Sequence, residues 1–422
     1  MICASGLWVV RTVTAALLVG GPVGAGSAAC ATPAAPDASD PVVPGAMSQG
    51  DVDRLAGPGG RLPVRRAVDL RVPGAGSWAE HVSDRGVVIG GARGDDGRYH
   101  AFRWQAGAAV LLPEDGYGSM AGDVNVHGQV AGSVTTQDGR QRTVVWEPDG
   151  TVVEIAAPPE HTVPWDIDDT GRVAVNWHDP GSGMPRAAVW EDGRLTLLGD
   201  LGGGTSQVAG ADALNNRGLV VGTAVTADDR RRAFVWRDGV MTALPAPATA
   251  DAYAEGVTAR GDVVGQIADP AGRSGYVVWE KGRLRYLDLQ GGYLVGVNDR
   301  GAVAGNVTVG DGTYRGIVAG RRGTLQLTTL GGPSAGTGAL SNLGVVVGWA
   351  ERTGDTAPHP VAWVRGRVVP LGEQLPGLTI RGGMASDINE SGQVVGHLQP
   401  VTGPDPSDYT QHAVLWELVP RR

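Results

Sequence analysis

A serine within a glycine-rich pentapeptide is the clearest candidate nucleophile in this chain. Residues 332–336 read GPSAG and match the GxSxG pattern, in which Ser334 would attack an acyl carbon after a histidine takes its proton. That chemistry requires the serine to stand on a sharp turn between a strand and a helix. No helix is predicted after Ser334, and residues 201–206 (LGGGTS) form a similar connector elsewhere. We therefore predict no catalytic residue at this position.

Histidine and carboxylate side chains come next, because they serve as metal ligands and as acids and bases. None of the eight histidines belongs to an HExxH pair, and the twelve-residue calcium pattern of alternating oxygen ligands is missing from the sequence. Four aspartates lie in turns that recur along the chain, where aspartate accepts backbone N–H hydrogen bonds: Asp84, Asp168, Asp169 and Asp299. The sequence therefore predicts no metal site and no cofactor.

Two tryptophans and a histidine are the candidates for ligand binding. Trp177, His178 and Trp349 follow predicted strands and begin polar loops that contain aspartate and arginine. An indole ring beside such charges suits stacking on a sugar or anchoring of a protein contact. The alternative is that each tryptophan covers the edge of the core. We predict Trp177, His178 and Trp349 as ligand-binding residues.

These residues are positioned by a repeat that runs through most of the chain. The segment VSDRGVVIG at residues 82–90 returns, with drift, in seven further units. A period of this length indicates a repeat architecture, in which each unit is one supersecondary structure packed on its neighbours. The glycine at the fifth position of the segment recurs at intervals of 40 to 48 residues, as Gly86, Gly128, Gly171, Gly218, Gly261, Gly301, Gly344 and Gly392.

Each unit is predicted to contain four short strands. In the fourth unit residues 215–218 (NNRG) form the turn between the first and second strands, because Asn and Gly both tolerate positive φ. Residues 237–239 (RDG) form the turn between the third and fourth strands. Variable polar loops separate the second and third strands. All eight loops should emerge on one face of the assembled units, here called the loop-rich face, where function is expected.

The third strand of most units carries a tryptophan with an apolar residue two positions before it. Residues two apart point to the same face of a strand, and the residue between them is also mostly apolar. A strand that is apolar on both faces is buried on both faces, as it would be between two neighbouring blades. In the sixth unit Ala319 replaces the tryptophan, so that blade should be the loosest unless a neighbour fills the space. The tryptophans of this column are Trp104, Trp146, Trp190, Trp236, Trp279, Trp363 and Trp416.

The eighth unit stops soon after Trp416 and lacks its own fourth strand. Residues 63–73 (PVRRAVDLRVP) stand before the first unit as a fourth strand stands before later units. We therefore predict an all-β fold, an eight-bladed β-propeller closed by an N-terminal strand that completes the last blade. Closure removes the exposed strand edges that an open array would leave. A seven-bladed propeller is the alternative.

The N-terminal region is predicted to direct export. Residues 1–29 have a single charge, a short apolar core and a small-residue cleavage box, which together are typical of a signal peptide. Residues 30–61 are rich in Ala, Pro and Asp and are predicted to form a flexible tether before the propeller at residues 62–422. Cys30 follows the cleavage box and is a candidate for lipidation. The apolar core is too short for a transmembrane segment.

The overall charge argues against a nucleic-acid partner. The chain carries a formal net charge of −9 and has a sequence pI of about 5.4, whereas phosphate binding needs a basic face. With at most one cysteine after export, the fold cannot depend on an internal disulfide or a cysteine metal cluster. The chain is predicted to be a monomer.

The motifs as a set resemble a known family. Residues 100–104 (HAFRW), residues 389–396 (NESGQVVG) and residues 412–416 (HAVLW) are similar to the HAF repeat of probable extracellular bacterial proteins. The resemblance covers about residues 66–416, although only the first unit keeps the HAF tripeptide itself. It implies secretion and a propeller-like fold, and it implies no reaction and no catalytic residues.

These features favour a secreted or surface-tethered binding module that recognises a protein or a glycan through its loop-rich face. The main alternative is a polysaccharide hydrolase or lyase with a site in the central channel, and a third is a structural spacer of the cell wall. An enzyme would need two carboxylates and a His or Tyr gathered across blades in one pocket. Carboxylates bound within turns would instead favour the binding module.

Overall fold

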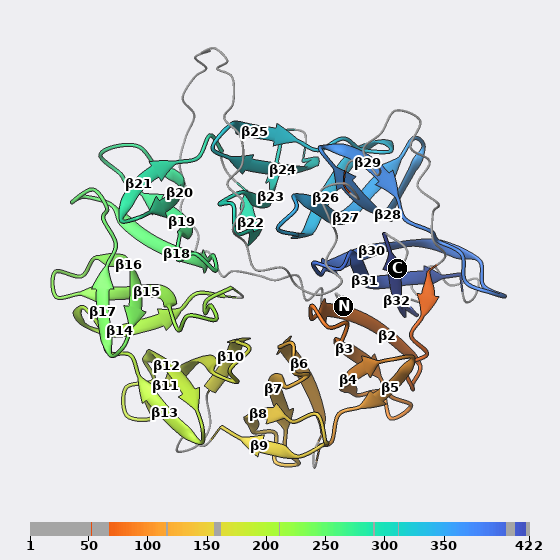
Figure 1. The fold of residues 1–422 in the computed structure, drawn as a ribbon, viewed down its shortest axis with the longest axis horizontal. Coiled ribbons are helices and arrows are strands. Elements are labelled where there is room, and N and C mark those ends of the chain that lie inside the picture. The colour runs from red at the N-terminus through yellow and green to blue at the C-terminus, as the bar shows by residue number, and fades with distance from the viewer. Residues whose placement is uncertain are drawn as a thin grey trace, which may run out of the picture.

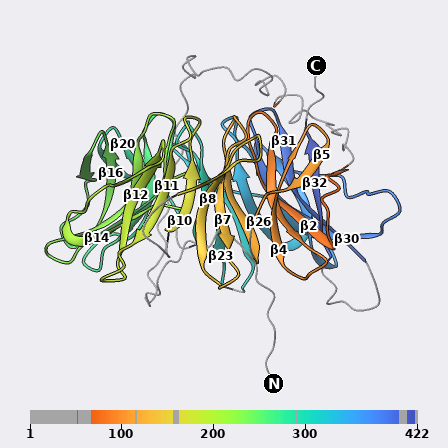
Figure 2. The ribbon, with the colours of Figure 1, turned by 90° about the horizontal axis from the view of Figure 1, so that it is seen from below.

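The computed structural model describes residues 52, 67–114, 117–155, 162–210, 212–289, 292–310, 312–401 and 410–418. The regular elements in these ranges are β-strands, which form eight antiparallel sheets of four strands each. Figure 1 shows the sheets as blades around a ring, and Figure 2 shows the ring from its edge. The predicted eight-bladed β-propeller is confirmed, and the seven-bladed alternative is wrong.

The first four blades each contain four consecutive strands. The first strand of a blade lies towards the centre of the ring and the fourth lies outside (Figure 1). Blade 1 comprises β2 (Gly76–Val82), β3 (Val88–Arg93), β4 (Tyr99–Gln105) and β5 (Ala108–Leu111); blade 2 comprises β6 (Gly118–Val124), β7 (Val130–Thr135), β8 (Gln141–Trp146) and β9 (Val152–Glu154); blade 3 comprises β10 (Thr162–Ile167), β11 (Val173–His178), β12 (Pro185–Glu191) and β13 (Arg194–Leu197); blade 4 comprises β14 (Gly202–Val208), β15 (Val220–Thr226), β16 (Arg231–Arg237) and β17 (Val240–Ala243).

The remaining blades repeat this order, except that blade 8 takes its outermost strand from the start of the chain. Blade 5 comprises β18 (Asp251–Val257), β19 (Val263–Ala268), β20 (Gly275–Glu280) and β21 (Arg283–Tyr286); blade 6 comprises β22 (Tyr293–Val297), β23 (Val303–Thr308), β24 (Tyr314–Gly320) and β25 (Gly323–Gln326); blade 7 comprises β26 (Gly331–Leu340), β27 (Val345–Arg352), β28 (Asp355–Val364) and β29 (Arg367–Pro370); blade 8 comprises β30 (Ile380–Ile388), β31 (Gln393–Pro400), β32 (His412–Glu417) and β1 (Val68–Asp69).

The ring closes where β1 pairs with β32, as the truncated eighth unit predicts. Val68 lies opposite Leu415, and the N–H of Leu70 donates to the carbonyl of Ala413 at 3.0 Å. His412 Nδ1 lies 3.0 Å from Asp69 Oδ2 on the same strand pair. Figure 1 shows β1 as the orange arrow beside the dark blue β32. Strands from the N-terminal and C-terminal parts of the propeller therefore belong to one sheet.

The predicted tryptophan column lies between blades. Trp236 alone of the seven is only half-buried. In four blades the indole N–H also donates to a backbone carbonyl of the connector that leaves the preceding blade. Trp146 donates to Pro113, Trp279 to Pro245, Trp363 to Thr328 and Trp416 to Gly372, each at 2.7 Å. Each of these indoles thus contributes both apolar contact and a directed bond between neighbours.

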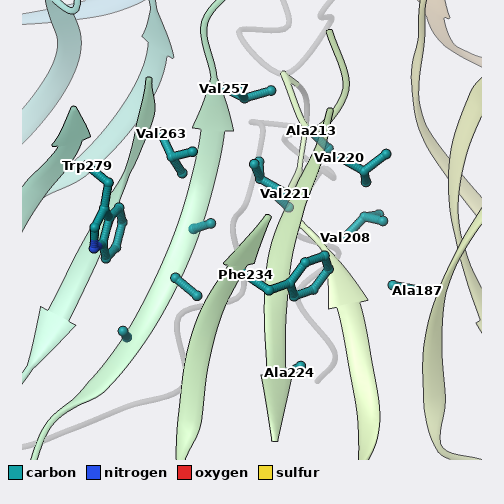
Figure 3. Packing of buried hydrophobic residues seen from close by; sticks show 14 of the residues in the cluster. Ala187, Val208, Ala213, Val220, Val221, Ala224, Phe234, Val257, Val263 and Trp279 are labelled. Atoms are coloured by element: carbon teal, nitrogen blue, oxygen red, sulfur yellow. The ribbon is translucent and has the colours of Figure 1, made fainter. Parts of the chain in front are cut away.

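Apolar clusters cross the boundaries between blades. Figure 3 shows one that extends from Ala187 of blade 3 through Val221 and Phe234 of blade 4 to Trp279 of blade 5. Ala319, which replaces the tryptophan in blade 6, is 1% exposed and shares a cluster with apolar side chains of blade 5. The neighbouring blade therefore fills the space at Ala319.

The recurring turns bond to each other around the ring. The asparagine that opens a turn donates its amide to a carbonyl in the turn of the next blade, as Asn125 does to Asp168 at 3.0 Å. The next side chain accepts an N–H from the preceding blade, so that Asp299 receives the N–H of Ala259 at 2.7 Å. The same acceptor position is filled by Asp84, Asp169, Asn216, Asn342 and Glu390. The prediction that the turn aspartates accept backbone N–H bonds is confirmed.

The antiparallel order of the strands places the loops and connectors on one face of the ring and the tight turns on the other. Because neighbouring strands in a blade are antiparallel, the loops between second and third strands emerge on the same face as the connectors between blades. The tight turns emerge on the other face. This arrangement matches the predicted loop-rich face.

Most of the N-terminal predictions fall outside the described residues. The signal peptide at residues 1–29 and the lipidation candidate Cys30 lie there entirely. Val52, from the predicted tether at residues 30–61, is 2% exposed and belongs to an apolar cluster of blades 7 and 8. Over the ranges that the structure describes, no helix has the length and apolar character to cross a bilayer.

Removal of a column indole should destabilise the whole ring. Trp363 is fully buried and its N–H is bonded to Thr328, so Trp363→Ala should lower the free energy of unfolding by about 3–5 kcal/mol. Trp236→Ala should cost less, because Trp236 is only half-buried. Denaturant titration of both variants measures the difference. An equal loss in the two variants would contradict this role for the column.

Candidate functional site

The structure does not bring the predicted ligand-binding residues together. Trp177 and His178 lie on β11 of blade 3, and Trp349 lies on β27 of blade 7. Figure 1 places these blades on opposite sides of the ring. All three residues belong to second strands, so the prediction that they begin the loops is wrong. The strands extend further than expected because Trp177 pairs with Arg186 and Trp349 with Pro360.

The two tryptophans also face different neighbours. Trp349 comes one residue after the recurring glycine of the second strand, Gly348, whereas Trp177 comes two residues after Val175, which fills the glycine position. Since side chains alternate along a strand, this offset of one residue turns the indoles to opposite faces of their blades. Their proposed roles in binding must therefore be considered separately.

Trp177 is packed towards blade 2. Its ring contacts the apolar cluster that includes Ala131 and Val145 of that blade, and its Nε1 is buried without a hydrogen-bond partner in the described part of the chain. Trp349 instead lies over Gly336, where an added Cβ would come within 2.5 Å of the indole Nε1. The surroundings of Trp177 match the alternative interpretation, a residue that covers the core, and ligand binding by any of the three remains a prediction.

Ser334 lies in a position unsuited to nucleophilic catalysis. It stands within strand β26, not on a turn before a helix. Its Oγ accepts the N–H of Tyr314 at 3.4 Å, and its own N–H donates to Glu351 Oε2 at 2.9 Å. Ser334 thus connects blade 6 to blade 7, in keeping with the sequence interpretation.

The repeat histidines connect loops to connectors. His359 is 3% exposed, with Nδ1 2.9 Å from Glu373 Oε2 and Nε2 3.0 Å from Asp355 Oδ2. His100 lies in the same way between Asp96 and Glu114. The sequence contains the signal for this arrangement, an aspartate four residues before the histidine and a glutamate fourteen after it, and the sequence analysis did not recognise it. These histidines fix the backbone of the loop-rich face.

Aspartates that pair with the repeat histidines have lowered pKa values. The backbone N–H of Ala357 and the ring of His359 together lower the pKa of Asp355 below its ordinary value. In the closing strand pair, burial would raise the pKa of Asp69, but the hydrogen bond from His412, the backbone N–H of Arg71 and the nearby charges of both residues together lower it below its ordinary value. Both carboxylates are therefore ionised structural partners near neutral pH.

Aspartates of adjacent blades approach each other near the inner strands. Asp123 Oδ2 accepts the N–H of Ile167 at 3.1 Å, and Asp166 Oδ2 accepts the N–H of Leu214 at 2.8 Å. Burial, together with the nearby charge of Asp123, raises the pKa of Asp166 well above its ordinary value. Both side chains are bonded to the backbone of the next blade. No group of three His, Cys, Asp or Glu suited to a metal ion occurs among the described residues.

Glu255 is the most unusual carboxyl group of the inner strands. Its Oε1 accepts the amide of Gln266 at 2.5 Å, while its Oε2 is buried without a hydrogen-bond partner among the described residues. Burial raises the pKa of Glu255 to about 7. The repeat does not fix the residue at this inner-strand bulge. Glutamate also stands there in blade 1, as Glu80, tryptophan stands there in blade 3, and glycine, valine or serine stands there in blades 2, 6, 7 and 8.

Exposed aromatic side chains gather on the loop-rich face of blades 1 and 2. The rings of Trp78 and Tyr99 have centroids 5.6 Å apart and meet edge to face at 75°. The guanidinium carbon of Arg98 lies 3.9 Å from the centroid of the Tyr117 ring. Tyr99 is 56% exposed and Tyr117 is 48% exposed. Trp78, Arg98, Tyr99 and Tyr117 are here called the aromatic patch, which the sequence analysis missed.

Contacts in the backbone make the patch continuous across two blades. A Cβ added at Gly118, the residue after Tyr117, would lie 2.7 Å from the carbonyl oxygen of Tyr99. Gly118 has φ +136°, a conformation that L side chains rarely adopt. Glycine at this position therefore lets the start of β6 approach the start of β4 closely enough to align the two halves of the patch.

Comparison with known proteins finds solved structures of low similarity. No family model matches the chain, and no curated protein matches it. The β-propeller domain of the Trilobed protease from Pyrococcus furiosus is 9% identical with a TM-score of 0.43, over 60% of this chain and 82% of that one. A prolyl endopeptidase structure is 12% identical with a TM-score of 0.48, over 78% of this chain and 55% of that one, so this chain spans about half its length.

A third similar structure is virginiamycin B lyase from Staphylococcus aureus. It is 12% identical with a TM-score of 0.39, over 83% of this chain and 98% of that one. At these identities and scores, nothing about the activity or ligands of these proteins is carried over to this chain.

Glu255 should make stability depend on pH. Because its folded-state pKa of about 7 lies above the ordinary value, folding favours the protonated form, and stability falls as pH rises from about 4.5 to about 7. Glu255→Gln removes this loss, so the variant should gain roughly 3 kcal/mol relative to the original protein between pH 4 and pH 8. Unfolding midpoints at the two pH values measure the gain, with Glu154→Gln as the control for loss of one charge. A gain that is equal at both pH values would contradict the assignment.

Proposed function

We propose that this chain is a binding module, secreted or tethered to the cell surface, that recognises a protein or a glycan through its loop-rich face. The aromatic patch supports this proposal most directly. Exposed aromatic side chains beside an arginine are the residues that contribute most to recognition surfaces. The proposal of export rests on residues 1–29, which have the features of a signal peptide.

The state of the carboxylates supports binding over catalysis. Asp123 and Asp166 accept backbone N–H bonds of the next blade, and the turn aspartates accept N–H bonds as well. Carboxylates held in this way stabilise the ring through contacts between neighbouring blades. This is the arrangement that the sequence analysis associated with a binding module.

Glu255 is the observation that favours the alternative, a polysaccharide hydrolase or lyase. Its pKa of about 7 would suit a general acid. Glycoside hydrolysis generally uses a pair of carboxyl groups, one of which raises the pKa of the other. The pKa of Glu255 is raised by burial, with no second carboxylate contributing to the shift. A single buried acid supports the enzyme less well than the patch supports the binder.

A retention experiment tests the proposed function. The purified protein should bind to a cell-envelope fraction or to an arrayed polysaccharide, and the heat-unfolded protein should not. Binding should survive in Glu255→Gln, and no reducing sugar should be released. Release of sugar that disappears in Glu255→Gln would favour the enzyme, and retention by none of the fractions would contradict the binding module.

A further inference from the structure

One half of the aromatic patch is held rigidly by blade 1. A Cβ added at Gly91 would lie 2.2 Å from Trp78 Cζ2, which shows that the indole rests directly on the backbone of β3. The indole N–H donates to Glu80 Oε1 at 2.7 Å. The indole meets the ring of Tyr99 edge to face, and more than half of Tyr99 remains exposed. A ligand that stacks on Tyr99 therefore meets a ring whose position is already fixed, which lowers the entropic cost of binding.

The other half is held across the boundary between blades. Arg98 lies over the ring of Tyr117, and its NH1 is 3.7 Å from Asp96 Oδ2. Asp96 in turn accepts the backbone N–H of Arg98 at 3.0 Å. The Arg98 guanidinium thus lies between the carboxylate of Asp96 and the ring of Tyr117, and Tyr99 is the next residue along the chain.

The charges around the patch argue for a neutral ligand. A carboxylate already stands beside each half of the patch, since Asp96 pairs with Arg98 and Glu80 accepts the indole N–H of Trp78. An acidic polymer would be repelled, and Arg98 already has an anionic partner in Asp96. The polar groups that remain are hydrogen-bond acceptors and donors beside exposed rings. A sugar can use both features of this surface. The apolar face of its ring stacks on an aromatic side chain, and its hydroxyl groups form hydrogen bonds with the polar groups beside that side chain.

The small size of the patch argues against a stable protein partner as its main occupant. A standard protein interface uses about 20–30 residues on each side. The aromatic patch has four, on an open face formed by the starts of β2, β4 and β6. Such a surface suits a chain that lies along it and contacts one ring after another.

We propose that the aromatic patch binds a neutral polysaccharide, with sugar rings stacked on Tyr99 and Tyr117 and hydroxyl groups bonded to Glu80 and Arg98. This inference rests on the proposed function and names the class of its ligand. Because Tyr99 and Tyr117 belong to adjacent blades, the polymer would cross the boundary between blades 1 and 2.

Binding to insoluble cellulose and to chitin, two neutral polysaccharides, tests the inference. The full protein should be retained by at least one of them, and Tyr99→Ala combined with Tyr117→Ala should weaken retention by about tenfold or more. Tyr314→Ala is the matched control. Tyr314 begins the third strand of blade 6 as Tyr99 begins that of blade 1, is 42% exposed, and has no stacked ring among the described residues. It should bind as the original protein does, and unfolding midpoints of all variants should agree.

The possible failures separate the two proposals. Retention that is unchanged in the double variant would overturn the role of the aromatic patch while the binding module stands. Retention by an envelope protein, with none by either polysaccharide, would overturn the neutral-polysaccharide inference and again leave the module in place. A protein that binds no polysaccharide and no envelope fraction would overturn both.

Discussion

The apolar residues on both faces of each blade must be covered by a neighbour on either side. Val221 and Phe234 of blade 4 pack in one cluster with Ala187 of blade 3 and Trp279 of blade 5, and similar clusters cross other boundaries between blades. A row of such blades would leave an uncovered face and an unpaired edge at each end. Ring closure removes both, and the pairing of β1 with β32 is the step that completes it. The indole N–H groups donate to the connector of the preceding blade, and the turn asparagines donate to the turn of the next blade, so each blade is bonded to both of its neighbours.

The need to hold the blades together also explains how many of the polar side chains are used. Residue types that often act in catalysis here complete structural hydrogen bonds. Asp166 accepts the N–H of Leu214 and Ser334 accepts that of Tyr314 between blades, and His412 pairs with Asp69 within blade 8. The aromatic patch lies outside these bonds, on the face where loops can vary without disturbing the contacts between blades.

The blade number and the closing strand could be predicted because both follow from spacing, which is a property of the sequence itself. The recurring glycines and the missing fourth strand after Trp416 were sufficient for that. The candidate site could not be predicted in the same way. Trp177 and Trp349 look alike in the sequence, yet one residue of register places them on opposite faces of their blades, and ring geometry places them on opposite sides of the molecule. Gly118, the residue after Tyr117, lies close to the carbonyl oxygen of Tyr99 because glycine allows the two blades to approach, a contact that no local pattern encodes.

The pairing of β1 with β32 is tested most directly by a disulfide. Val68 and Leu415 are opposite each other, and directly opposed residues of antiparallel strands have Cα atoms about 4.5–5.5 Å apart, within the range that a disulfide spans. With Cys3 and Cys30 changed to serine, Val68→Cys combined with Leu415→Cys should form an internal disulfide on mild oxidation, detected by mass spectrometry. The control pair, Val68→Cys with Ala362→Cys at the corresponding position of blade 7, should stay reduced. Free thiols in the first pair, or equal cross-linking in both, would contradict a ring closed by its own N-terminal strand.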